Sequence, residues 1–150
     1  MSKQSEPSYE TTLLLLVRDH CLCLHMQRAA RAVARRFDAA FRPLDLTNGQ
    51  FSLMTSLNRP EPPHLGAVAA LLAMDRTTLT AALKPLERRG LVEIKRDPKD
   101  RRGRHLSLTP EGRRLLTRAL PIWDETRIAV ERLLRKGAPP RLRQELRALS

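Results

Sequence analysis

Apolar residues recur at helical spacing through most of the chain. From Thr11 to about Arg42 this spacing predicts one long helix that ends at Pro43, preceded by a loose, flexible tail over residues 1–10. Polar N-cap residues, prolines and glycines divide the remainder into further helices. These are predicted over residues 48–57, 65–72, 76–89, 110–136 and 141–149.

The period changes after Gly90. Residues 91–95 and 105–108 alternate apolar and polar side chains, which is typical of half-buried strands. Pro98 and Gly103 mark turns between them, so the pattern predicts a hairpin with a long basic tip. The fold class predicted is mostly α with a small β-hairpin, a winged helix-turn-helix flanked by long N- and C-terminal helices. Pro85 and Pro121 fall inside predicted helices and predict local bends.

Charge is concentrated in the middle of the chain. The 150 residues carry a net charge of +12, and residues 76–104 alone hold 10 basic and 4 acidic side chains. Such a surplus favours a polyanionic partner. The run of apolar residues at 13–17, like every other apolar run in the chain, is far short of the ~20 residues needed to span a bilayer. With no secretory signal and two cysteines, we expect a cytoplasmic protein with reduced thiols and no membrane contact.

The same basic region has the features of a DNA reader. The predicted helix from Arg76 is braced by a short preceding helix, and its first turn offers side chains that suit the major groove of double-stranded DNA. Asp100 is expected to orient a neighbouring arginine at the hairpin tip. The groove candidates are Arg76, Thr77, Thr78 and Thr80, and the tip candidates for phosphates or a minor groove are Lys99, Arg101, Arg102 and Arg104. A solvated basic face is the alternative interpretation, which the separation of the charges between helix and hairpin disfavours.

Several segments resemble the MarR family of bacterial winged helix-turn-helix transcription regulators. They are Leu-Thr-Asn-Gly-Gln-Phe-Ser-Leu-Met at 46–54, Met-Asp-Arg-Thr-Thr-Leu-Thr at 74–80, Leu-Glu-Arg-Arg-Gly-Leu-Val at 86–92, Asp-Pro-Lys-Asp-Arg-Arg at 97–102 and Leu-Ser-Leu-Thr-Pro-Glu-Gly at 106–112. They follow one another in unbroken order from 46 to 112, which makes the resemblance more specific than any single motif.

The resemblance implies a homodimer with one MarR-like domain per chain, residues 11–150. Dimerisation helices are expected at 11–43 and 110–150, and the winged helix-turn-helix at 47–108. It also places Lys84 on the recognition helix, together with the groove candidates, and matches the family's Asp-x-Arg wing motif to Asp100 and Arg102. We therefore expect a repressor of a pseudo-palindromic operator that a small-molecule effector releases.

The effector is less clearly marked than the DNA-binding region. An aromatic compound or organic anion between the dimer helices and the winged helix is expected, with candidates His25, Arg28, Phe51 and Trp123. Cys23 matches the reactive cysteine of the organic-hydroperoxide-sensing branch, to which the chain has a possible distant relation. That branch's tyrosines are replaced by Phe37 and Asn48, which favours a packing role for Cys23.

Three other interpretations have less support in the sequence: a metal site, an enzyme and a non-specific DNA-binding protein. His20, Cys21, Cys23 and His25 share helix faces in pairs, but no carboxylate or paired motif supports a metal, so no metal or other cofactor is expected. The chain has none of the GxGxxG, GxxxxGK[ST], GxSxG or HExxH motifs, and we predict that it is not an enzyme. A non-specific architectural DNA-binding protein shares the charge but does not need the polar first turn at 76–80.

Overall fold

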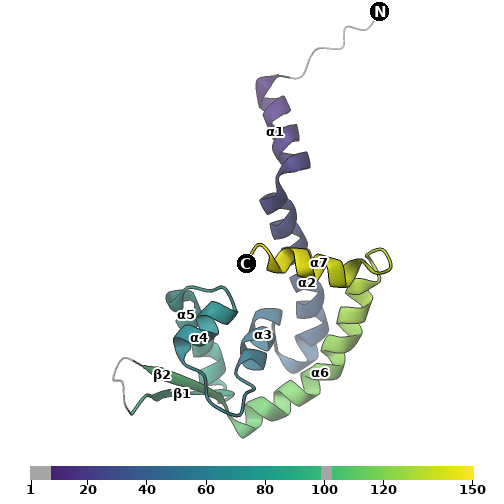
Figure 1. Ribbon diagram of the computed structural model, residues 1–150. Coiled ribbons are helices and arrows are strands. Elements are labelled where there is room, and N and C mark those ends of the chain that lie inside the picture. Colours follow the sequence, from purple (N-terminus) through teal and green to yellow (C-terminus); the bar gives the residue numbers. More distant parts are fainter. Residues whose placement is uncertain (1–7, 99–102) are drawn as a thin grey trace, which may run out of the picture. The chain divides into compact units, whose positions relative to one another are not determined.

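A computed structural model describes residues 8–98 and 103–150. The chain divides into two compact units, Met1–Arg35 and Arg36–Ser150, and each is described by itself. The helices and strands, as Figure 1 labels them, are α1 (Tyr9–His20), α2 (Leu22–Phe41), a 3-10 turn (Arg42–Leu44), α3 (Asn48–Ser56), α4 (Leu65–Leu71), α5 (Arg76–Arg88), β1 (Val92–Arg96), β2 (Arg104–Leu108), α6 (Pro110–Glu131) and α7 (Ala138–Arg147). The mostly helical fold with a two-stranded hairpin confirms the predicted fold class.

The predicted single helix over residues 11–42 is wrong, because Cys21 interrupts it. Cys21 adopts an extended conformation, with ψ at 102°, and ends α1. Its Sγ accepts a hydrogen bond of 3.4 Å from the amide of Leu24, as an N-cap side chain does, so that α2 starts at the next residue. At the other end, Ser8 caps α1, which begins at Tyr9 and includes two residues of the predicted tail. Residues 1–7 of that tail lie outside the described residues.

The core of the second unit is built where α3, α4 and α5 meet the hairpin. Phe41, Leu53, Met54, Val68, Leu79, Leu83, Leu86 and Leu106 are its most deeply buried large side chains. Thr47 begins α3 with a reciprocal capping box, in which its side chain accepts from Gln50 N and the Gln50 side chain accepts from Thr47 N. The Asp38 carboxylate accepts from the Asn48 amide at 2.7 Å, which joins the end of α2 to the start of α3.

Helices α4 and α5 form the helix-turn-helix. The chain bends by 104° between them, within the range typical of this motif. Ala73 makes the turn with a positive φ of 51°, and Asp75 caps α5 as predicted from the sequence. Pro85 lies inside α5, which nevertheless runs without interruption from Arg76 to Arg88.

The hairpin follows directly. Gly90 has a φ of 67° and ends α5 in the left-handed conformation that its sequence position predicted. Antiparallel pairing runs from Val92 opposite Leu108 to Arg96 opposite Arg104, within one residue of the predicted strands. The hairpin is held to the loop before α4, since the Leu106 amide donates to the Pro63 carbonyl at 3.0 Å.

The C-terminal helices differ from their predicted bounds. Helix α6 begins as predicted at Pro110, capped by Thr109, but ends at Glu131 rather than near Lys136. The next turns tighten to i→i+3 hydrogen bonds, and Gly137 then reverses the backbone with a φ of 79°. Pro139 and Pro140 were expected to precede α7, but they lie in its first turn. The first amide groups of a helix have no partner within the helix, so a proline there costs no helical hydrogen bond. Helix α7 therefore starts at Ala138, three residues early.

No single helix among the described residues is long and apolar enough to cross a membrane, and one bent pair, α4 with α5, passes that test only when the two are taken together.

Candidate nucleic-acid interface

Helix α5 has two chemically distinct faces. Leu79, Leu83 and Leu86 are 0–1% exposed and attach the helix to the core. The side chains of α5 that the sequence assigned to DNA all lie on its exposed face: Arg76, Thr77, Thr78, Thr80 and Lys84. Because the apolar residues are fixed in the core, the polar face is presented by a rigid support.

The start of α5 is ordered by Asp75. Its carboxylate accepts from the Thr78 amide at 2.8 Å and from the Thr78 hydroxyl at 2.5 Å. The hydroxyl hydrogen bond, and then the amide one, hold the pKa of Asp75 below its ordinary value. The Thr78 hydroxyl therefore donates its hydrogen to Asp75, which fixes the orientation of this side chain in the first turn of α5.

Arg76 lies against the first turn of α4. A methyl group at Gly66 would come within 3.1 Å of Arg76 Nη2, so the absence of a side chain there makes room for the guanidinium. The carbonyl of Arg76 accepts from the Thr80 hydroxyl at 2.7 Å. The exposed Arg76 side chain of α5 thus lies next to Gly66 of α4.

The far end of α5 is also anchored, by a residue that sequence reasoning missed. Arg89 donates to the backbone carbonyls of Asp45, at 2.5 Å, and Leu44, at 3.4 Å. These contacts join the C-terminus of the recognition helix to the turn that precedes α3. They connect residues 44 and 45 positions apart, so no local pattern marks them.

The wing candidates are only partly placed. Lys99, Asp100, Arg101 and Arg102 lie outside the described residues, and their roles stay predictions. Arg104 is the first residue of β2, is half-buried, and donates from Nη1 to the Gly103 carbonyl at 3.1 Å. Its place at the root of the tip is consistent with the hairpin predicted from the sequence.

A cavity of about 710 Å³ lies between α3, α4 and α6. Two of the predicted effector residues, Phe51 and Trp123, line it with ring centroids 6.2 Å apart, and the Arg127 guanidinium lies 5.6 Å from the Trp123 ring. The other lining residues are Ser52, Thr55, Ser56, Asn58, Arg59, Leu71, Leu72, Arg113, Leu116, Thr117 and Leu120. The remaining effector candidates, His25 and Arg28, are exposed on α2 in the first unit.

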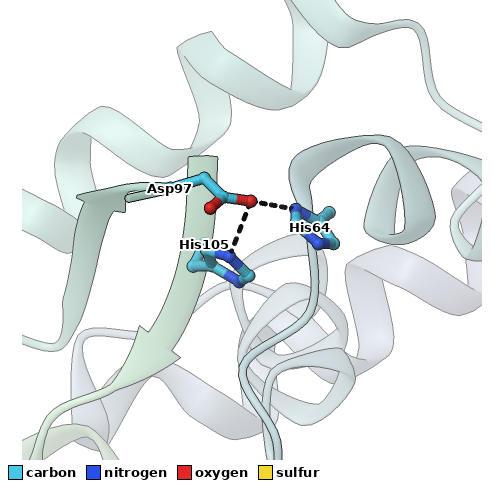
Figure 2. Close-up of side chains that lie close together, drawn as sticks. All are labelled: His64, Asp97 and His105. Atoms are coloured by element: carbon cyan, nitrogen blue, oxygen red, sulfur yellow. Dashed lines mark ion pairs between the residues drawn. The ribbon is translucent and has the colours of Figure 1, made fainter. Parts of the chain in front are cut away.

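The tip end of the hairpin strands holds a polar cluster that sequence reasoning did not assemble. His64, Asp97 and His105 place their side chains together, with His64 on the loop before α4, Asp97 at the end of β1 and His105 on β2 (Figure 2). Asp97 Oδ2 lies 3.2 Å from His105 Nε2 and 3.9 Å from His64 Nδ1. The two histidines are 41 residues apart in sequence, so spacing alone cannot reveal the cluster.

Comparisons with known proteins agree with this geometry. The MarR family model matches residues 46–103. The chain is 34% identical to the M. tuberculosis transcriptional regulator MosR, solved in complex with DNA, with a TM-score of 0.79 over 87% of this chain and 93% of that one. The chain belongs to the MarR family.

Two curated relatives refine the relationship. Transcriptional regulator HosA of Escherichia coli O111:H- is 39% identical over 82 residues, which are 53% of this chain and 59% of HosA. The chain thus matches less than two thirds of the length of that relative. The organic hydroperoxide resistance transcriptional regulator of Bacillus subtilis is 29% identical over 101 residues, or 67% of this chain and 69% of that one. This MarR-family chain is therefore distantly related to the hydroperoxide branch, as its sequence suggested.

Both cysteines of this MarR-family chain are free thiols. Cys23 is exposed and its Sγ accepts a hydrogen bond of 3.2 Å from Gln27 Nε2, whereas Cys21 is half-buried and caps α2. The two thiols thus have different surroundings, and only Cys23 offers an accessible sulfur with a side-chain donor.

Proposed function

We propose that this MarR-family protein is a homodimeric, sequence-specific transcription regulator that represses by binding a pseudo-palindromic site in double-stranded DNA. The observation that carries the proposal is the exposed face of α5, which presents Arg76 and three threonines on a helix fixed at both ends. Arginine reads guanine through two hydrogen bonds, and threonine contacts phosphate or a thymine methyl. The basic hairpin supplies a second contact to the same duplex. MosR, the similar protein, is solved with DNA bound.

Dimerisation is supported by apolar side chains that each chain leaves uncovered. Neither α1 nor α7 buries any residue, although leucines occur on both. Leu14 and Leu16 of α1 are 67% and 56% exposed, and Leu142 and Leu146 of α7 are 43% and 41% exposed. Burial of such side chains against a second copy removes their apolar area from water. Sedimentation equilibrium should give twice the chain mass, and Leu14→Lys with Leu142→Lys should reduce it.

Release by a small aromatic compound or organic anion is the regulatory part of the proposal. The cavity beside α3 has an apolar wall that includes Phe51 and Trp123, and arginines at its edge that suit a carboxylate. Trp123 is the chain's one tryptophan, so its fluorescence reports directly on this cavity. A benzoate-type probe should quench that emission and lower DNA affinity, whereas Leu120→Phe, which adds volume at the cavity lining without adding a second tryptophan, should weaken both effects.

Oxidation of Cys23 is the second candidate for release. It is favoured by the exposed sulfur with its Gln27 donor and by the distant relative that is an organic hydroperoxide resistance regulator. If Cys23 senses peroxide, an organic hydroperoxide releases DNA from the parent and from Cys21→Ser, but not from Cys23→Ser. Release that survives Cys23→Ser would exclude peroxide sensing through Cys23.

The expected site of action of the proposed regulator is chromosomal DNA in a bacterial cytoplasm.

Three arginine substitutions test the DNA assignment. Arg76→Ala should change the preferred base in the half-site, because it removes a base-edge contact, with a loss of about 1–3 kcal/mol for the best site. Arg102→Ala should weaken binding to all sequences, because it removes a backbone or minor-groove contact. Arg147→Ala, on α7, removes the same charge outside the winged helix and is the matched control. Equal effects of all three on affinity would contradict the assignment.

A further inference from the structure

The cluster at the tip end of the hairpin strands has the composition of a metal site. His64, Asp97 and His105 each offer one ligand atom, and these atoms lie within 4.8 Å of one another. In a tetrahedral zinc site with bonds of 2.0–2.1 Å, neighbouring ligand atoms are about 3.3 Å apart. The 3.2 Å between Asp97 Oδ2 and His105 Nε2 already has this value. His64 Nδ1, at 3.9 Å from the same oxygen, needs a shift of about 0.6 Å, and its side chain is 57% exposed and therefore free to turn.

The hydrogen bonding of His105 selects the nitrogen that faces Asp97. His105 Nδ1 lies 3.2 Å from the backbone carbonyl of Pro62. A carbonyl oxygen only accepts, so Nδ1 must be the donor and carries a hydrogen. The other ring nitrogen, Nε2, therefore faces Asp97 Oδ2, and it is the atom that a cation would share with this carboxylate. A histidine that donates its other nitrogen to a backbone carbonyl is the arrangement typical of metal-bound imidazole.

The backbone holds the two histidines side by side whether or not an ion is present. His64 and His105 form an antiparallel β-bridge, and their rings are 4.1 Å apart between centroids. The adjacent Leu106 amide bonds the Pro63 carbonyl. Two ligands are therefore pre-organised by main-chain contacts that join the hairpin to the loop before α4, and Asp97 completes the set from β1 (Figure 2).

We propose that His64, Asp97 and His105 bind a first-row divalent cation, with zinc as the best match to two imidazoles and one carboxylate, and with water in the fourth position. The ion ties the tip end of the hairpin strands to the start of α4. Resting on the proposed DNA-binding function, this tie sets the wing relative to the recognition helix, so that metal binding strengthens contact with DNA. The site differs from the pairs of cysteine and histidine that the sequence suggested on α2.

The first experiment tests the site on protein without DNA. Zinc is titrated calorimetrically into a Cys21→Ser/Cys23→Ser chain, which lacks competing thiols. One zinc per chain is expected, with affinity falling at least tenfold in Asp97→Asn and in His105→Gln. His20→Gln, on α1 outside the cluster, is the matched control and should leave the zinc affinity unchanged. Zinc should also raise the melting temperature of the parent but not of Asp97→Asn, which shows that a folded variant has lost the site.

Cobalt identifies the donor atoms. A cobalt complex of the unmodified chain should show d–d absorption without a thiolate charge-transfer band if nitrogen and oxygen donors hold the ion. A strong thiolate band would place the metal at the cysteines and overturn the proposal. Zinc affinity equal in Asp97→Asn and in the thiol-free parent would show that Asp97 is not a ligand and would overturn it as well. Absence of any zinc binding to the thiol-free chain would overturn the proposal equally.

A DNA arm separates this inference from the function on which part of it rests. Duplex affinity is measured with and without zinc in the thiol-free parent and in Asp97→Asn. An increase with zinc in the parent alone supports the link between metal and wing. Zinc binding at the three residues with unchanged duplex affinity refutes that link. Zinc binding with no DNA binding under any condition refutes the proposed function and leaves the metal site intact.

Discussion

Gly112 is the point at which α6 touches the root of the wing most closely, and replacement by alanine tests that packing. A Cβ at Gly112 would lie 2.1 Å from the Leu91 carbonyl oxygen and 3.4 Å from Leu108 Cδ2. The helix cannot easily move away. The Gly112 amide donates to Thr109 Oγ1 at 2.9 Å, and the Thr109 amide donates to the same Leu91 carbonyl at 3.1 Å.

The expected magnitude follows from two opposed effects. Alanine in a helix is about 1 kcal/mol better than glycine, but overpacking costs typically 1–3 kcal/mol and occasionally more. A carbon–oxygen approach this short requires backbone displacement of about 1 Å, toward the upper end of that cost. We expect Gly112→Ala to lower the free energy of unfolding by about 1–3 kcal/mol. For a chain of this size the melting temperature should fall by roughly 3–10 °C.

Gly49 provides the matched control. It lies in the first turn of α3, where the nearest atom to an added Cβ is Thr47 Oγ1 at 4.0 Å. Gly49→Ala should therefore be neutral or stabilise by up to about 1 kcal/mol. Both variants are melted by far-ultraviolet circular dichroism at one protein concentration, because the stability of a dimer depends on concentration. Gly112→Ala as stable as the parent would refute the close approach of α6 to Leu91.

Three further substitutions test the capping and the core. Because the pKa of Asp75 is lowered in the folded chain, its contribution to stability is complete above the ordinary carboxyl pKa and is lost as pH falls through the folded-state pKa. The free energy of unfolding in urea should therefore fall less steeply with acidification in Asp75→Asn than in the parent. The same pH dependence in both proteins would contradict the Thr78 hydrogen bonds. Thr47→Ala breaks the capping box and should cost about 1 kcal/mol in the same assay; no loss would show that the α3 cap is dispensable. Leu79 is 0% exposed, so Leu79→Ala should lower the free energy of unfolding by about 2–5 kcal/mol. Leu71 is 56% exposed, so Leu71→Ala should lower it by less than about 1 kcal/mol. The reverse order would contradict the assigned face of α5.

Local signals were sufficient for much of the winged helix. Thr47, Asp75 and Thr109 each cap the helix that follows, and Gly90 ends α5, as predicted. These features involve residues within one turn, so they can be recognised from the sequence. The polar face of α5 was predictable for the same reason, since burial follows the helical period of Leu79, Leu83 and Leu86.

The features that sequence reasoning missed depend on backbone geometry or on distant contacts. Apolar spacing continues across Cys21, so the interruption between α1 and α2 was hidden. The first-turn role of the prolines in α7 was mistaken for a break, because proline is compatible with both. The contacts of Arg89 and the cluster around Asp97 join residues separated by tens of positions, and only the folded chain shows them.

Selection of fragmented genomic DNA on the reduced, purified protein at about 150 mM salt tests the central claim most directly, because non-specific charge contacts are weak there. The account predicts enrichment of one or a few inverted repeats with half-sites about one helical turn apart. Arg76→Ala should change the enriched half-site. Uniform recovery of fragments by the parent, with no repeat, would contradict a sequence-specific regulator and indicate general DNA coating instead.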